Sequence, residues 1–162
     1  MDEYSLEENM SKIVNQYAPQ TAFAVYAADE LKWPHSHQNV AIIQNTKPRG
    51  QQGEHYLLWL SNKSGPIEFF DSLGRPITYY QDLKIPNGRL VEANHKQLQS
   101  DKSSNCSLFC LYVMKNRLQN RKMESIMMDF SPTRLICNDL LVLRFYSTLK
   151  TNLNVRNRKF CI

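Results

Sequence analysis

The chain lacks long apolar runs and closely paired cysteines, and these absences argue against several classes of protein. No stretch is apolar enough over a sufficient length to span a bilayer, so we expect no contact with a membrane. The acidic, polar start MDEYSLEENMSK does not resemble a secretory signal peptide, which favours an intracellular protein. Cys106, Cys110, Cys137 and Cys161 form no CxxC pair, which argues against a zinc site and predicts free thiols in a reducing compartment.

Length and composition indicate one globular domain. The 162 residues suffice for a hydrophobic core, and the hydrophobic share of 42% and charged share of 22% are ordinary. No internal repeat or low-complexity segment interrupts the chain. We therefore expect residues 1–162 to form a single, monomeric domain.

Positive charge gathers in the C-terminal half. The chain carries 20 Lys and Arg against 15 Asp and Glu, a formal net charge of +5. Two interpretations stay open, namely solvated helix faces with a solvated tail, or a surface that binds a polyanion such as nucleic acid. The residues that would form this surface are Lys115, Arg117, Arg121, Lys122, Arg156, Arg158 and Lys159.

Periodicity predicts helices at both ends of the chain around a central run of strands. Apolar residues recur at helical spacing after Ser5, where Glu8 completes a capping-box pattern. This order favours an α+β fold. The expected helices cover 5–18, 106–121, the 123–130 region and a segment after Pro132, and the expected strands fall within 39–46, 55–62, 65–74 and the start of 88–99.

Cys106 is the thiol with an unusual setting. It follows the polar loop QSDKSSN and opens the clearest helical pattern in the chain. The N-terminus of a helix carries a partial positive charge and free backbone N–H groups, so it would lower the pKa of a thiol placed there. The backbone N–H of Cys106 would also be available to an oxyanion.

A thiolate nucleophile needs a base, and the base needs an orienting group. His55 begins an apolar strand directly after a glycine-containing loop, whereas the other histidines lie in polar segments. Asp71 ends the next strand, 16 residues later, so an antiparallel pair would bring it beside His55. Taken alone, His55 also fits a structural role, and Asp71 also fits a turn cap.

Gln99 lies seven residues before Cys106, and its neutral amide could donate to a developing oxyanion. A surface glutamine is the simpler interpretation of this residue alone, and Gln97 is a second candidate. The order His55, Asp71, Gln99, Cys106 is more informative than any one member.

Four blocks in this order resemble the adenain-type cysteine proteases, a group that includes the adenovirus maturation protease and, more distantly, the SUMO-processing proteases. The match runs over residues 39–142. The blocks are AIIQNTKPRGQQGEHYLLWL, IEFFDSLG, LQSDKSSNCSLFCLYVM and FSPTRLICNDLLV.

The resemblance implies a papain-like fold with a central mixed or antiparallel sheet, flanking helices and the nucleophile at the N-terminus of a central helix. It implies that Cys106 is the nucleophile, His55 the base, Asp71 its acidic partner and Gln99 the oxyanion donor, with no metal. It further implies cleavage of viral structural precursors at glycine-containing sites, in the host nucleus and the virion, with DNA and an activating peptide as potential partners.

The chain departs from the family in three places. Ser107 stands where the family usually has Gly, and Tyr56 stands where it often has Trp. No cysteine precedes Cys106, so an activating peptide cannot be tethered by a disulfide upstream of the glutamine as in adenovirus enzymes. Two alternatives remain open at this point: an isopeptidase for ubiquitin-like modifiers, and a non-catalytic basic virion or DNA-binding protein of the same fold.

Overall fold

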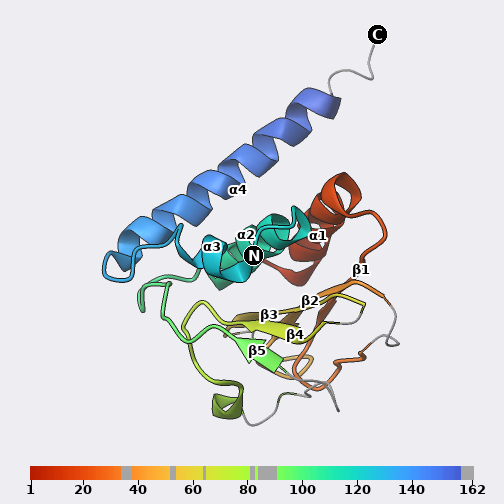
Figure 1. Cartoon of the computed structure of the whole chain (residues 1–162). Helices are drawn as coiled ribbons and strands as arrows, with labels where there is room; N and C mark the ends of the chain where they lie inside the picture. The colour runs from red at the N-terminus through yellow and green to blue at the C-terminus, as the bar shows by residue number, and fades with distance from the viewer. Residues whose placement is uncertain (34–37, 52–53, 64, 81–82, 84–90, 158–162) are drawn as a thin grey trace.

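A computed structural model describes residues 1–33, 38–51, 54–63, 65–80, 83 and 91–157, with side chains as far as residue 151. One mixed sheet forms a layer, and α1, α2 and α4 lie together over one of its faces (Figure 1). This arrangement confirms the predicted α+β class with a central sheet flanked by helices. The elements are α1 (Glu3–Tyr17), β1 (Ala22–Tyr26), β2 (Val40–Asn45), β3 (Tyr56–Ser61), β4 (Ile67–Phe70), η1 (Ile77–Tyr79), β5 (Val91–Ala93), α2 (Cys106–Leu118), α3 (Met123–Met127) and α4 (Leu135–Asn157).

The five strands lie in the order β1-β2-β3-β4-β5. The central pairs β2–β3 and β3–β4 are antiparallel, while the outer pairs β1–β2 and β4–β5 are parallel. Leu58 and Leu60 of β3 pack in the core on the helical side, and Leu57 and Trp59 pack in a second core on the opposite face. Because successive side chains of a strand point to opposite faces, β3 is anchored from both sides and its ends are held firmly.

Helix α1 begins earlier than its predicted cap. Asp2 is the N-cap and accepts a hydrogen bond from the Ser5 amide at 2.7 Å, so the prediction of a capping box formed by Ser5 and Glu8 is wrong. An aspartate at this position also complements the positive end of the helix dipole. The apolar side of α1, including Leu6 and Met10, packs in the same core as β3 and α2.

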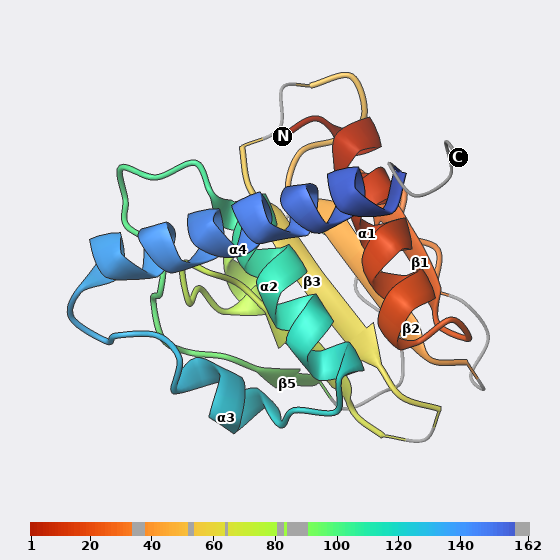
Figure 2. The same ribbon diagram turned by 90° about the horizontal axis from the view of Figure 1, so that it is seen from above.

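Helix α2 is buried on nearly all sides, whereas the sequence predicted one apolar face. It packs against β3, α1 and α4, which surround it in Figure 2. Polar positions such as Ser107 and Asn116 are therefore buried along with Phe109 and Val113. A helix without a solvated face is held in a fixed position, and this fixes the location of its first residue, Cys106.

The described helices include none that is both long and apolar enough to cross a membrane.

Candidate active site

The ends of β3 and β4 bring His55 and Asp71 together. His55 immediately precedes β3 and Asp71 immediately follows β4, and the antiparallel pairing places these two ends at the same edge of the sheet. The Nε2 atom of His55 lies 2.6 Å from Oδ1 of Asp71. Both residues are buried, with His55 6% and Asp71 0% exposed. The hydrogen bond fixes the orientation of the ring and leaves Nδ1 for another partner.

The Asp71 carboxylate is surrounded by donors. Its oxygens accept from the backbone amides of Leu73 at 2.8 Å and Arg75 at 3.1 Å, and from the hydroxyl of Tyr80 at 2.6 Å. Burial alone would raise the pKa of Asp71, but His55, Tyr80 and the Leu73 amide lower it below its ordinary value. Asp71 therefore remains ionised and can stabilise a protonated His55.

Asn94 fixes the backbone of Asp71, and sequence reasoning missed it. The Asp71 amide donates to Oδ1 of Asn94 at 2.8 Å, and Nδ2 of Asn94 donates to the Asp71 carbonyl at 2.7 Å. Tyr80 was also missed; its ring stacks on that of His55 at a centroid distance of 6.4 Å. Neither residue belongs to a sequence motif that would have identified it.

Cys106 is the first residue of α2, at the end of the helix that carries positive partial charge. Asn105 is the N-cap and makes no capping hydrogen bond with its side chain. Burial would raise the pKa of the Cys106 thiol, but hydrogen bonding to His55, the charge of His55 and the backbone of Tyr56 and Ser107 lower it below its ordinary value. Cys106 is buried, with 6% of the residue exposed.

The pKa of His55 shifts in the direction opposite to that of Cys106. Burial alone would lower its pKa, but hydrogen bonds with Asp71 and Cys106 and their negative charges raise the pKa of His55 to about 9. A lowered thiol pKa and a raised imidazole pKa together favour a thiolate–imidazolium pair. Since Nε2 of His55 is engaged by Asp71, the nitrogen available to the sulfur is Nδ1.

Cys110 lies one helical turn after Cys106 in α2, in different surroundings. It is fully buried, and its sulfur lies 3.5 Å from the carbonyl oxygen of Tyr56. Burial raises the pKa of Cys110 well above its ordinary value, so it is a structural thiol. Cys137 is an exposed free cysteine on α4, and Cys161 lies outside the described residues.

Both polar atoms of the Gln99 side-chain amide make hydrogen bonds within the protein. Its Oε1 accepts from the Ser72 hydroxyl at 2.6 Å, and its Nε2 donates to the Ser103 carbonyl at 2.7 Å. One of the two Nε2 hydrogens therefore remains available to another acceptor. Gln97, the second candidate, instead donates to the Gln99 carbonyl at 3.0 Å and to Asp101 at 2.8 Å, so it supports the loop.

The loop that carries Gln99 packs tightly on the turn that follows Asp71. Gly74 has φ of +65°, and a Cβ there would lie 2.5 Å from the carbonyl carbon of Lys96. The Ser72 carbonyl accepts from the amides of Leu98 at 2.8 Å and Gln99 at 2.9 Å. Asn138 of α4 donates to the Leu98 carbonyl at 2.9 Å from the other side. These contacts fix Gln99 relative to Asp71.

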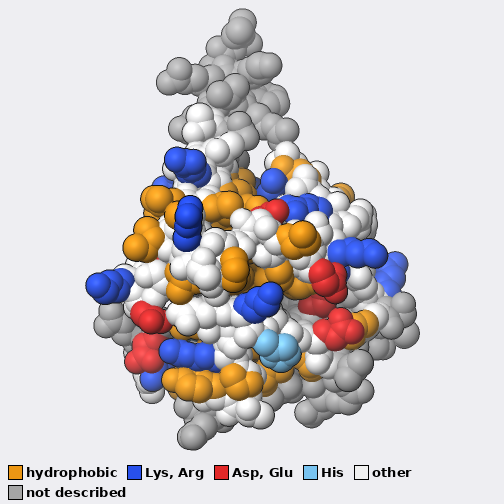
Figure 3. Space-filling view, turned by 60° about the vertical axis from the view of Figure 1, so that its left-hand side comes forward, with side chains coloured by type: hydrophobic (Ala, Val, Ile, Leu, Met, Phe, Trp, Pro, Cys, Tyr) orange, Lys and Arg blue, Asp and Glu red, His pale blue; other side chains and the backbone are white. Residues whose placement is uncertain are grey.

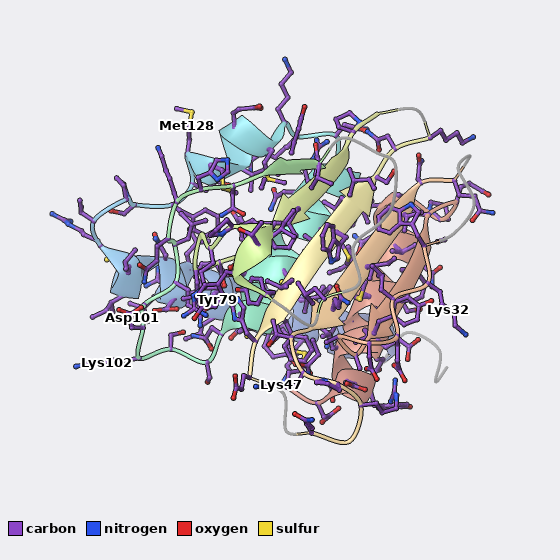
Figure 4. All side chains as sticks on the ribbon, turned by 90° about the horizontal axis from the view of Figure 1, so that it is seen from below. Lys32, Lys47, Tyr79, Asp101, Lys102 and Met128 are labelled. Atoms are coloured by element: carbon purple, nitrogen blue, oxygen red, sulfur yellow. The ribbon has the colours of Figure 1, made fainter. Side chains whose placement is uncertain are left out.

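A cleft of about 650 Å³ is lined by His55 and Gln99, while Cys106 and Asp71 are not among its lining residues. Three segments form its walls: the end of β2 with the approach to β3, the turn after β4, and the Gln99 loop. Among the residues labelled in Figure 4, Lys47, Tyr79 and Asp101 line this cleft, one from each of these segments. The lining residues are Thr46, Lys47, Glu54, His55, Leu73, Arg75, Tyr79, Tyr80, Gln99, Ser100, Asp101 and Ser103.

Ser107 fits its position without distortion. It lies inside α2 and is 3% exposed, and Asn120 is the one non-glycine residue with positive φ in the described part of the chain. Its backbone is among the groups that lower the pKa of Cys106. A glycine is therefore not required by the backbone conformation at this point.

Among the residues with described side chains, the structure does not join the predicted basic residues into one free surface. Arg117 donates to Glu68 at 2.7 and 2.6 Å, and Arg121 donates to Asp129 at 2.7 and 3.0 Å. Lys115 lies over the ring of Tyr17, 5.6 Å from its centroid. On the face drawn in Figure 3, Lys and Arg side chains are interspersed with acidic and apolar ones.

Of the other predicted basic residues, Lys122 is exposed. Arg158 and Lys159 lie outside the described residues, and Arg156 lies in the part of α4 whose side chains are not described. Among residues with described side chains, no group of three or more His, Cys, Asp or Glu could hold a metal ion.

Comparison with known proteins shows that no family model matches the chain and that no curated protein sequence matches it.

Proposed function

We propose that this protein is a cysteine endopeptidase in which Cys106, His55, Asp71 and Gln99 carry out amide hydrolysis. The observation that supports this most strongly is the buried imidazole of His55, which lies 2.6 Å from Asp71 and lowers the pKa of the Cys106 thiol. The opposite pKa shifts of Cys106 and His55 are the shifts that a thiolate nucleophile requires.

In the proposed reaction the Cys106 thiolate attacks the scissile carbonyl carbon of a peptide in the cleft. The carbonyl oxygen becomes negative and is stabilised by the free amide hydrogen of Gln99 and by the backbone N–H of Cys106. His55 then gives its proton to the leaving amine, and the C–N bond breaks to leave a thioester.

In the second half of the cycle, His55 is neutral and acts as a base. It removes a proton from a water molecule, whose oxygen attacks the thioester carbonyl. Collapse of this second intermediate releases the carboxylic acid product and restores the thiolate. Asp71 keeps the ring oriented through both halves and stabilises its protonated form.

The α+β fold and the order of these residues are compatible with an adenain-type enzyme, and we include that assignment in the proposal. It carries an expectation about substrate, namely structural precursor proteins of a virus cut at glycine-containing sites. The pairing of Arg117 with Glu68 and of Arg121 with Asp129 gives little support to the alternative of a purely DNA-binding protein.

The test is covalent labelling with a vinyl sulfone peptide that ends in glycine, followed by mass spectrometry of the modified site. We expect Cys106 to be labelled first, and Cys106→Ala to abolish rapid labelling. Cys137→Ser is the matched control because Cys137 is an exposed thiol outside the site. Equal, slow labelling of Cys106 and Cys137 would contradict the proposal, and a preference for probes ending in Gly-Gly from a ubiquitin-like modifier would redirect it to an isopeptidase.

A further inference from the structure

Arg75 lies at the wall of the cleft, with its guanidinium stacked over an aromatic ring. Its guanidinium carbon lies 4.4 Å from the centroid of the Tyr79 ring, which is 57% exposed. The backbone amide of Arg75 donates a hydrogen bond to the Asp71 carboxylate, and the Arg75 side chain lies near the hydroxyl of Tyr80. A guanidinium stacked on a ring is already restricted in its rotamers, so it loses less entropy when it binds a ligand.

Lys47 and Glu54 of the cleft pair with each other, and the partner of the Asp101 carboxylate is a neutral amide. Lys47 pairs with Glu54 at 3.3 Å, and Asp101 accepts a hydrogen bond from Gln97 at 2.8 Å. Within the described part of the chain, no carboxylate comes within ion-pair distance of the Arg75 side chain. Among the described residues, the Arg75 guanidinium thus has no ion-pair partner in the cleft.

Arg75 also lies close to the reacting groups. Tyr80, its neighbour, donates to the same Asp71 carboxylate that holds His55 and stacks on the His55 ring. An extended peptide advances by about 3.3 Å per residue, so a substrate side chain that meets Arg75 belongs to a residue near the scissile bond.

We propose that Arg75 is a specificity-determining residue that binds a side-chain carboxylate, Asp or Glu, of the substrate within a few residues of the cleaved bond. The planar guanidinium offers paired N–H donors that match a carboxylate. The inference rests on the proposed function, because it assigns the cleft to a polypeptide substrate.

The experiment uses the full chain and a set of glycine-containing peptides that differ by a single Glu or Gln at each position around the cut. The measured quantity is the ratio of kcat/KM for the Glu peptide to that for the Gln peptide. We expect a ratio of about ten at one position for the unmodified protein, falling toward one in Arg75→Gln. Arg75→Lys should retain part of the preference, and added salt should reduce it.

Lys102→Gln is the matched control, because it removes one positive charge from the exposed Gln99 loop without removing a lining side chain (Figure 4). It should leave the ratio near that of the unmodified protein. The proposal is overturned if no position favours Glu, if Arg75→Gln keeps the preference, or if Lys102→Gln removes it equally.

A separate measurement distinguishes this proposal from the proposed function. If no peptide is cleaved, the endopeptidase assignment fails, and binding of the same fluorescent Glu and Gln peptides is measured by anisotropy with Cys106→Ala. About tenfold tighter binding of one Glu peptide, lost when Arg75→Gln is added, would support the role of Arg75 in binding. Equal binding of every Glu and Gln pair would overturn it.

Discussion

The two ends of helix α2 are built in opposite ways. At the first turn, Cys106 follows an N-cap without a side-chain hydrogen bond, and the nearby His55 lowers the pKa of its thiol. At the last turn, Arg117 forms a two-point ion pair with Glu68, and the C-cap amide of Gln119 donates back to the helix. At the first end of α2, polar groups remain available to a ligand. At the last end, the charged side chain and the cap amide are paired within the fold.

We expect residues at the first end of α2 to control reactivity and residues at its last end to control stability. No residue of α2 is fully exposed, so the packing that supports the helix is the same for a substitution at either end. Substitutions at the first end should change chemistry with small effects on folding, and substitutions at the last end should do the reverse. The predictions below test that separation, from the largest expected effect to the smallest.

Cys106→Ala should lower peptide cleavage by about 10⁴-fold or more, because it removes the nucleophile. Cys110→Ala, one turn further along the same helix, should retain activity, since that thiol is buried with a raised pKa. Steady-state kinetics on a glycine-containing peptide measures both. Comparable losses in the two variants would remove the distinction between the thiols.

Gln99→Ala should lower kcat by about 10²–10³-fold, the usual cost of losing one oxyanion donor. Its neighbour Gln97→Ala should cost much less, because Gln97 donates to the loop backbone and to Asp101. Circular dichroism on both variants checks that the fold is intact. A larger effect for Gln97 would assign the oxyanion role to that residue instead.

The pH profile of kcat/KM should be bell-shaped. Activity rises as pH increases through the lowered pKa of Cys106, because the thiolate forms there, and falls as pH increases through the pKa of His55 at about 9, because the imidazolium is lost. Each limb should change by about tenfold per pH unit. Asp71→Asn should move the alkaline limb to lower pH, since a negative charge that raises the His55 pKa is removed.

Arg117→Ala should lower the free energy of unfolding by about 1–3 kcal/mol, because it leaves Glu68 without its partner in a partly buried position. The rate of Cys106 alkylation should stay unchanged in this variant. Urea unfolding and timed alkylation with iodoacetamide test the two statements. A slowed alkylation in a folded Arg117→Ala protein would show that the two ends of α2 are coupled.

The sequence predicted the helices and strands well where periodicity was strong. The α2 segment and the strands around His55 and Asp71 carried clear local patterns, and the structure confirms these elements. The cap of α1 was assigned to Ser5 in place of Asp2, because both positions offer a suitable side chain and only the backbone geometry separates them.

The residues that position the site were not predictable from local pattern. These residues lie in loops or at a helix start, and their partners are between 9 and 40 residues away, so each hydrogen bond depends on how the segments pack; they are Asn94, Tyr80, Ser72 and Asn138. Sequence reasoning could single out Cys106, His55 and Asp71 because they lie at the ends of regular elements. Their supporting groups are set by tertiary structure.

The hairpin of β3 and β4 has a practical consequence for engineering this chain. His55 and Asp71 lie at its open end, so the turn that joins the two strands lies at the opposite end of the sheet. An insertion in that turn, such as an epitope tag or a fluorescent reporter, should leave the separation of the imidazole and the carboxylate unchanged. An insertion of one residue between Asp71 and Gly74 would displace the turn that meets Lys96.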